Sequence, residues 1–125
     1  MQHIYTEKII TAILTTLNYK PEEVALASAI VGSDPIGSYL QGGGLIDAVV
    51  KIKGMAEKAK LPIDRFFQIL LTYYTADTAA YTADAQGKES LDYLFKFDHA
   101  NRSISFDEMT NKKVQNLKAA IILTI

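Results

Sequence analysis

Cysteine and tryptophan are absent from this chain of 125 residues, and only two histidines occur, His3 and His99. Without cysteine the protein cannot form a disulfide bond, a thiolate metal site or a cysteine nucleophile. Two histidines also leave few candidates for a general base. The sequence therefore excludes several kinds of chemistry before any motif is considered.

A strong net charge and a long hydrophobic run are also missing. The chain has 13 Lys and Arg against 14 Asp and Glu, a net charge of −1. This balance gives no overall positive field to attract phosphates, so we do not expect a dedicated nucleic-acid binder. The apolar runs are too short to cross a membrane, and the residues after Met1 do not resemble a signal peptide. We therefore expect a cytoplasmic protein without a membrane partner.

The composition that remains is that of an ordinary folded domain. Hydrophobic residues make up 49% of the chain and charged residues 22%, which argues against disorder. At this length we expect one helical domain over residues 1–125, with enough buried surface to be stable without crosslinks.

Apolar residues at three- and four-residue spacing predict a first helix over about residues 7–17. Thr6 precedes this pattern and is its expected N-cap. The predicted buried stripe of the helix consists of Ile9, Ile10, Ile13, Leu14 and Leu17. Thr11, Thr15 and Thr16 lie off that stripe.

Two further helices are predicted before residue 60. The first begins at Pro21, which suits the first helical position, and stops at Gly32. The second spans about residues 45–60, with a predicted buried stripe of Leu45, Val49, Ile52 and Ala56. Between them, Asp34 before Pro35 predicts the cap of one short helical turn. Three consecutive glycines, Gly42, Gly43 and Gly44, then end that turn, because each would cost a helix about 1 kcal/mol relative to alanine.

The stretch over residues 63–86 is predicted to be the central helix of a bundle. Its first half is apolar nearly all round, which predicts burial on all sides. The apolar residues are Phe66, Phe67, Ile69, Leu70, Leu71, Tyr73 and Tyr74. Gly87 is its expected end.

The last third allows two interpretations. Ser90 could cap a short helix through Leu91, Leu94 and Phe95, whereas alternating apolar residues on both sides of residues 99–102 predict a β-hairpin. Ser105 and Glu108 also have the spacing of a capping box, which would start the final helix earlier. We favour a short helix, a hairpin near residues 93–107, and a last helix over about residues 107–123. Its predicted buried stripe is Met109, Val114, Leu117 and Ile121. The expected fold is mainly α, a bundle of about five helices.

No motif predicts catalysis, a metal or a cofactor. His99 follows Asp98, but the residues around it are typical of an exposed turn. Residues 98–108 lack the spaced ligands and the central glycine of a calcium loop. The three glycines belong neither to a Gly-Lys-Ser/Thr phosphate loop nor to a G-x-G-x-x-G motif, and Asp47 in the following turn would repel an anion. We therefore expect a protein that is not an enzyme.

The central helix contains a repeat that could form a surface for a partner. Tyr74-Thr75-Ala76-Asp77 returns seven residues later as Tyr81-Thr82-Ala83-Asp84. This period stacks Tyr74 with Tyr81 and Asp77 with Asp84, beside a low-relief alanine stripe. One interpretation is a homodimer contact, and the other is an ordinary contact within the chain.

Three functional hypotheses follow. The leading one is a small protein that binds a partner protein, as an inhibitor, immunity protein, adaptor or assembly factor. The alternative is a module that binds a small ligand, nucleotide or anion. Its candidate residues are Tyr39, Gly42, Gly43, Gly44, Tyr74, Asp77, Tyr81 and Asp84. The third is nucleic-acid binding through Lys51, Lys53, Lys58 and Lys60, for which a solvated face is the simpler explanation.

Overall fold

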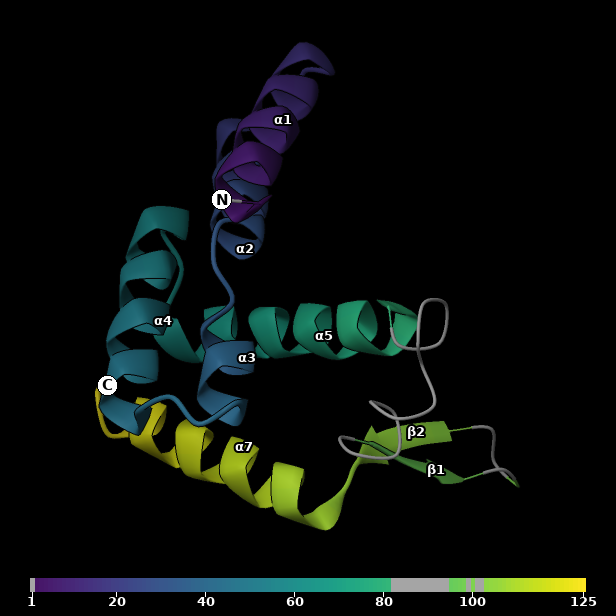
Figure 1. Ribbon diagram of the computed structural model, residues 1–125. Coiled ribbons are helices and arrows are strands. Elements are labelled where there is room, and N and C mark those ends of the chain that lie inside the picture. Colours follow the sequence, from purple (N-terminus) through teal and green to yellow (C-terminus); the bar gives the residue numbers. More distant parts are fainter. Residues whose placement is uncertain (1, 82–94, 99, 101–102) are drawn as a thin grey trace.

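Short segments with proline, glycine or a capping side chain divide the chain into helices (Figure 1). The computed structural model describes residues 2–81, 95–98, 100 and 103–125. These residues form α1 (Gln2–Thr16), α2 (Pro21–Val31), α3 (Pro35–Leu40), α4 (Leu45–Ala59), α5 (Ile63–Tyr81), β1 (Phe95–Asp98), β2 (Ser103–Phe106) and α7 (Glu108–Ile122). The prediction of a mainly α bundle is confirmed.

Local side-chain chemistry sets the starts of α3 and α7, and the cap of α3 was predicted. The Asp34 carboxylate accepts a hydrogen bond from the Gly37 amide at 2.9 Å and caps α3. The Asp107 carboxylate accepts one from the Thr110 amide at 2.7 Å and caps α7. Each bond satisfies an amide that has no partner within its own helix. Ser105 lies in β2, so the competing capping box is wrong.

The predicted start of α1 is also wrong. The helix begins at Gln2, so Thr6 lies within it and is not its N-cap. No proline or glycine precedes Pro21 in the sequence, so nothing breaks the helix before Thr6. A good capping residue marks a helix start only where the preceding residues cannot continue the helix.

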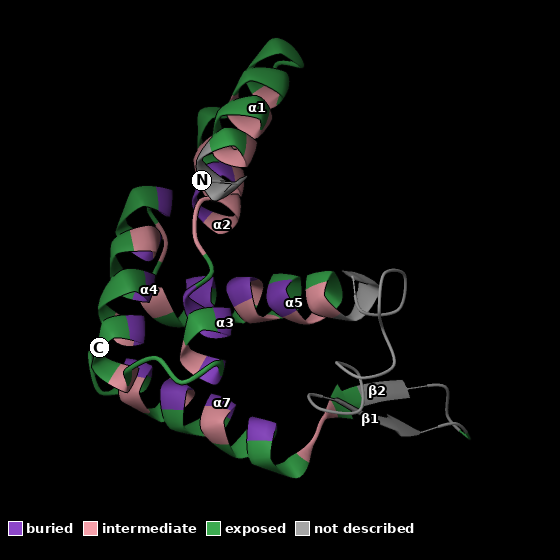
Figure 2. Cartoon of the chain, viewed as in Figure 1, coloured by how far each residue is buried: buried purple, intermediate pink, exposed green. Residues whose placement is uncertain are grey.

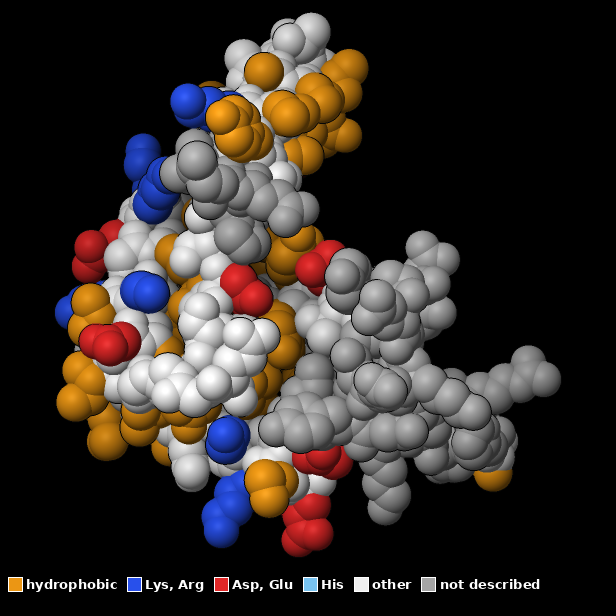
Figure 3. Space-filling view, in the orientation of Figure 1, with side chains coloured by type: hydrophobic (Ala, Val, Ile, Leu, Met, Phe, Trp, Pro, Cys, Tyr) orange, Lys and Arg blue, Asp and Glu red, His pale blue; other side chains and the backbone are white. Residues whose placement is uncertain are grey.

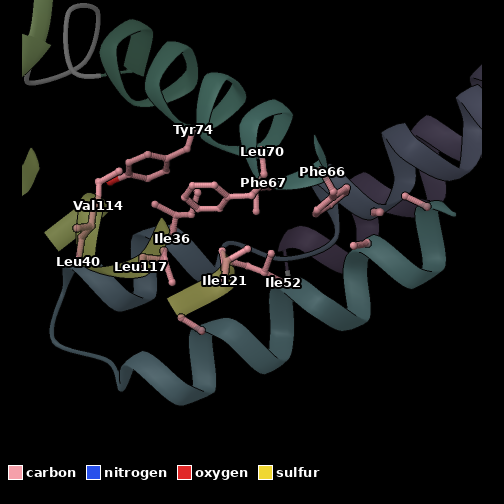
Figure 4. Packing of buried hydrophobic residues seen from close by; sticks show 14 residues of the cluster. Ile36, Leu40, Ile52, Phe66, Phe67, Leu70, Tyr74, Val114, Leu117 and Ile121 are labelled. Carbon is pink, nitrogen blue, oxygen red and sulfur yellow. The ribbon is translucent and has the colours of Figure 1, made fainter. Parts of the chain in front are cut away.

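The body of the protein consists of α3, α4, α5 and α7, which surround one hydrophobic core (Figures 1 and 4). In Figure 4, side chains from all four helices point toward one another. The largest fully buried apolar side chains are Phe66, Phe67, Ile36, Ile52, Leu117 and Ile121. The core therefore brings together residues from both halves of the chain.

Two predicted burial patterns need correction in the body. Helix α5 buries Phe66, Phe67, Leu70 and Tyr74 on one side, but Tyr73 is exposed. The helix is not buried on all sides, because its packing partners α3, α4 and α7 do not surround it. Met109 is also exposed, whereas Val114, Leu117 and Ile121 of the same predicted stripe are buried. Met109 lies in the first turn of α7, directly after the hairpin.

The predicted hairpin is confirmed. Strands β1 and β2 are antiparallel, with Phe95 opposite Phe106 and Phe97 opposite Ile104. Phe106 packs against the core, and β2 contacts α7, so the hairpin is supported by the helices as a two-stranded sheet requires. The predicted short helix from Ser90 and the predicted end of the central helix at Gly87 lie outside the described residues, although Phe95 itself lies in β1.

Helices α1 and α2 form an antiparallel pair that projects from the body, and we call this pair the arm (Figure 1). Residues 17–20 join the two helices, and Asn18 adopts a left-handed conformation with φ of 63°. The arm reaches the body chiefly through packing of α2 on α4. Buried residues are concentrated in the body in Figure 2, whereas α1 is largely exposed or half-buried. None of the described helices is long and apolar enough to cross a membrane.

Candidate functional site on the helical arm

The contact between the two helices of the arm includes a pair of hydroxyl side chains. Ser28 and Ala29 are the buried residues of α2. The Thr11 and Ser28 hydroxyl oxygens lie 2.5 Å apart, and the Thr11 hydroxyl donates to the Glu7 carbonyl at 2.8 Å. Since Thr11 donates to that carbonyl, we infer that Ser28 donates to Thr11. The threonine predicted to lie off the buried stripe is therefore part of the helix contact.

One line of large apolar residues on the arm faces outward. Tyr5, Ile9, Ile13 and Leu17 remain 63%, 57%, 48% and 62% exposed, respectively. They follow one another at four-residue spacing, which places them on one side of the helix. We call these four residues the arm row. Figure 3 shows hydrophobic side chains gathered on the arm.

The predicted buried stripe of the first helix is therefore only half right. Ile10 and Leu14 are half-buried in the arm, whereas Ile9, Ile13 and Leu17 are exposed. Helix α1 packs mainly on α2, and none of the other described helices makes comparable contact with it. An apolar helix face is buried only where a neighbouring element covers it, and no described element covers this one.

A small cavity lies where the arm meets α5. Its lining is Ile30, Val31, Ser33, Asp34, Leu70, Tyr73, Tyr74 and Asp77. The cavity measures about 50 Å³, enough for a few water molecules or the end of one side chain. The structure thus brings the predicted site residues Tyr74 and Asp77 together with Asp34, which sequence reasoning had assigned only a capping role.

The two phenols of this cavity are stabilised in their neutral form. Burial is the main cause that raises the pKa of Tyr73, and the charges of Asp77 and Asp34 raise it further. Burial also raises the pKa of Tyr74, while a hydrogen bond with Thr78 acts in the opposite direction. Both phenols therefore remain protonated and able to donate hydrogen bonds far above neutral pH. Among the described residues, neither Asp34 nor Asp77 forms an ion pair.

The other predicted ligand residues lie elsewhere. Tyr39 is half-buried and packs against the core, and Tyr81 ends α5, while Asp84 lies outside the described residues. The glycines follow the C-terminal end of α3, whereas Asp34 precedes its N-terminal end. Gly42 has a φ of 110°, and a side chain on Gly43 would lie 2.8 Å from the Ser38 carbonyl oxygen. The turn between α3 and α4 therefore explains two of the three glycines by backbone geometry.

A larger cavity, which sequence reasoning missed, separates the start of α5 from the end of α7. Its volume is about 370 Å³. Its lining is Asp64, Arg65, Phe67, Gln68, Lys118, Ile121, Ile122 and Ile125. The apolar character of the last residues was visible in the sequence, but only packing places them opposite Arg65.

The predicted basic face of α4 is exposed. Lys51, Lys53, Lys58 and Lys60 are all exposed, and Lys58 forms an ion pair with Glu7 of α1 at 2.5 Å. His99 lies outside the described residues. Comparison of the chain with protein-family models, with curated proteins and with solved structures found no significant match.

Proposed function

We propose that this chain is a small non-enzymatic protein that acts by binding a partner protein, and that the arm row is its contact surface. The observation that carries the proposal is the exposure of four large apolar side chains along one side of the arm, three on α1 and Leu17 directly after its last residue. A monomeric protein rarely exposes a continuous apolar patch of more than a few hundred Å² without a function for it.

The chemistry of the arm row supports a protein partner. The four residues are one tyrosine and three aliphatic side chains, with no charge among them. The centres of protein interfaces are depleted of charged residues and enriched in aromatic ones. Each aliphatic side chain that a partner covers would contribute roughly 1–2 kcal/mol, because about half of its surface is already buried. An inhibitor, immunity protein, adaptor or assembly factor would each use such a surface.

A photo-crosslinking amino acid in place of Ile13 tests this function, with the same probe in place of Thr15 as the control. Both residues are exposed on α1, but Thr15 lies off the arm row. In an extract of the source cells we expect one defined protein product from position 13 and none from position 15. Ile9→Glu in the same chain should abolish that product, and Thr15→Glu should preserve it. Equal products from both positions, or no product, would contradict the proposal.

A second candidate function is the binding of a small ligand, and the cavity between α5 and α7 favours it. Its volume of about 370 Å³ lies within the usual range for ligand sites, whereas the cavity beside Tyr74 and Asp77 is too small. The cavity is lined by apolar side chains together with two cationic side chains and one carboxylate. This lining suits an apolar molecule with an anionic end.

Thermal unfolding with decanoate and with decanol would test this second function. A ligand that binds only the folded chain raises its melting temperature with concentration. We expect decanoate to stabilise the protein more than decanol does, and Arg65→Gln with Lys118→Gln to remove that difference. Lys112→Gln, which changes an exposed lysine of α7 outside the cavity, is the control. No stabilisation by either compound would exclude this function.

A further inference from the structure

We propose that the protein which covers the arm row is a second copy of this chain. In the proposed dimer the two α1 helices cross in antiparallel directions, with the twofold axis between Ile9 and Ile13. Ile9 then contacts the partner's Ile13, and Tyr5 lies toward the partner's Leu17. The inference rests on the proposed function, since it uses the same surface and adds the identity of the partner.

The spacing of the arm row fits this crossing. Residues four apart form a ridge that is inclined to the helix axis, and such ridges from two helices interdigitate at a crossing angle of about −50°. This is the commonest packing class in globular proteins. The row contains four members of one such ridge and extends for about 18 Å along the helix. Each copy therefore presents a ridge of the kind that this packing requires from both helices.

The order of residues in the arm row is nearly symmetric on reversal. A twofold contact requires that if one residue contacts a second, the second contacts the first. Because positions 9 and 13 are both isoleucine, identical side chains meet at the twofold axis. Tyr5 and Leu17 occupy the two ends of the row. Ala12 is exposed beside the centre of the row, which allows the helices to approach closely.

Charge does not oppose the pairing of two identical chains. The arm row is uncharged, and Glu7 is turned toward Lys58 of its own body. The net charge of −1 gives only weak repulsion between copies. Antiparallel helices also place the positive end of each dipole beside the negative end of the other.

The size of the surface determines how strong the dimer is. The exposed part of the arm row covers roughly 400 Å² per copy, from typical side-chain areas. Two copies with the flanking Ala12, Thr16 and Tyr19 would bury about 1,000 Å² in total, the lower limit for a specific interface. We therefore expect a weak dimer that dissociates on dilution.

The absence of cysteine allows a direct test of the register, because any disulfide must come from introduced residues. Ile9→Cys in a tagged chain is mixed with Ile13→Cys in an untagged chain under mild oxidation. The antiparallel register predicts the mixed disulfide. It predicts little product from either variant alone, because two copies of position 9 are too far apart to bridge without movement. Thr15→Cys mixed with Ile13→Cys is the matched control and should give no product.

Light scattering over a range of concentrations provides the second measurement on the full chain. The mass of the parent should rise toward twice the monomer mass with concentration. Ile9→Glu should stay monomeric, and Thr15→Glu should behave like the parent. A melting curve confirms that each variant is folded.

The outcomes separate this inference from the proposed function. The mixed disulfide together with a rising mass supports the antiparallel dimer. Efficient disulfides from Ile9→Cys alone and from Ile13→Cys alone would overturn it in favour of parallel helices. A constant monomer mass without disulfides would overturn the second copy as partner, and the crosslinking experiment then decides whether a different protein binds the arm row. Failure of both experiments would remove the proposed function as well.

Discussion

The body and the arm differ in the size of the side chains that they bury. In the body, Phe66, Phe67 and Leu117 are almost completely buried. In the arm, the buried residues of α2 are Ser28 and Ala29, while large residues such as Ile9 are exposed. Covering a large apolar side chain stabilises whatever assembly covers it. The body therefore buries a core of large side chains, although it also exposes some, such as Ile46 and Leu123. In the arm the largest side chains of α1 are at least half exposed or only partly buried.

The largest expected effect is the loss of stability on truncation of a core side chain in the body, compared with truncation of an exposed side chain in the arm. Phe67→Ala should lower the free energy of unfolding by about 3–5 kcal/mol, because it leaves a cavity in a packed core. Ile9→Ala should lower it by less than about 1 kcal/mol in the dilute monomer, since half of that side chain is already in water. Denaturant unfolding at low protein concentration measures both. Similar losses for the two variants would contradict the distinction between body and arm.

Helix capping gives a smaller test in both regions. Asp107→Ala removes the side-chain cap of α7 and should cost about 1 kcal/mol, whereas at the start of α2 the Glu23 carboxylate accepts from the Lys20 amide at 3.0 Å. Asp107→Asn keeps an oxygen that can accept from the Thr110 amide and should recover most of the loss. If both Asp107 variants unfold at the same denaturant concentration as the parent, α7 does not depend on its cap.

The polar contact within the arm should contribute a smaller amount. Ser28→Ala removes the hydroxyl that contacts Thr11, and we expect a loss of about 0.5–1.5 kcal/mol. A double-mutant cycle with Thr11→Ala measures the interaction itself. The two losses should be less than additive, because either variant alone breaks the same hydrogen bond. Fully additive losses would show that the two hydroxyls contribute independently.

The ion pair between arm and body should contribute least. Lys58→Gln should cost less than about 1 kcal/mol, because the pair with Glu7 is partly exposed and screened by salt. The cost should shrink further at 1 M salt. Lys51→Gln, at another exposed lysine of α4, is the control and should have no effect. A loss of several kcal/mol for Lys58→Gln would mean that this pair, rather than packing of α2 on α4, holds the arm in place.

Local chemistry made much of the fold predictable. Pro21, the Asp34-Pro35 pair and Asp107 mark helix starts because each acts on the backbone of its own turn. The alternation of apolar residues around residues 95–106 predicted the hairpin, since strand side chains point to alternate faces. The exposed Met109 and the early start of α1 were missed, because burial and helix extension depend on neighbours that a local pattern does not contain.

The candidate site was much harder to predict than the fold. Tyr74 and Asp77 do line one cavity, but the three glycines lie at the opposite end of α3 from that cavity. No pattern of neighbouring residues indicated the cavity between α5 and α7. A cavity is formed by residues far apart in the chain, so its size follows from how helices pack. Three of the four residues of the arm row, Ile9, Ile13 and Leu17, were visible in the sequence as part of an apolar stripe that was assigned to the interior.

The sequence by itself determined the helical character of the chain, most helix ends, the hairpin and the absence of cysteine chemistry, because each depends on residues within a few positions of one another. Only the tertiary structure decided which apolar stripes are covered. Periodicity shows that a helix has an apolar face, but the arrangement of the other helices determines whether that face meets the core or water. The helices of the body cover one side of α5, whereas the arm row next to α2 stays exposed.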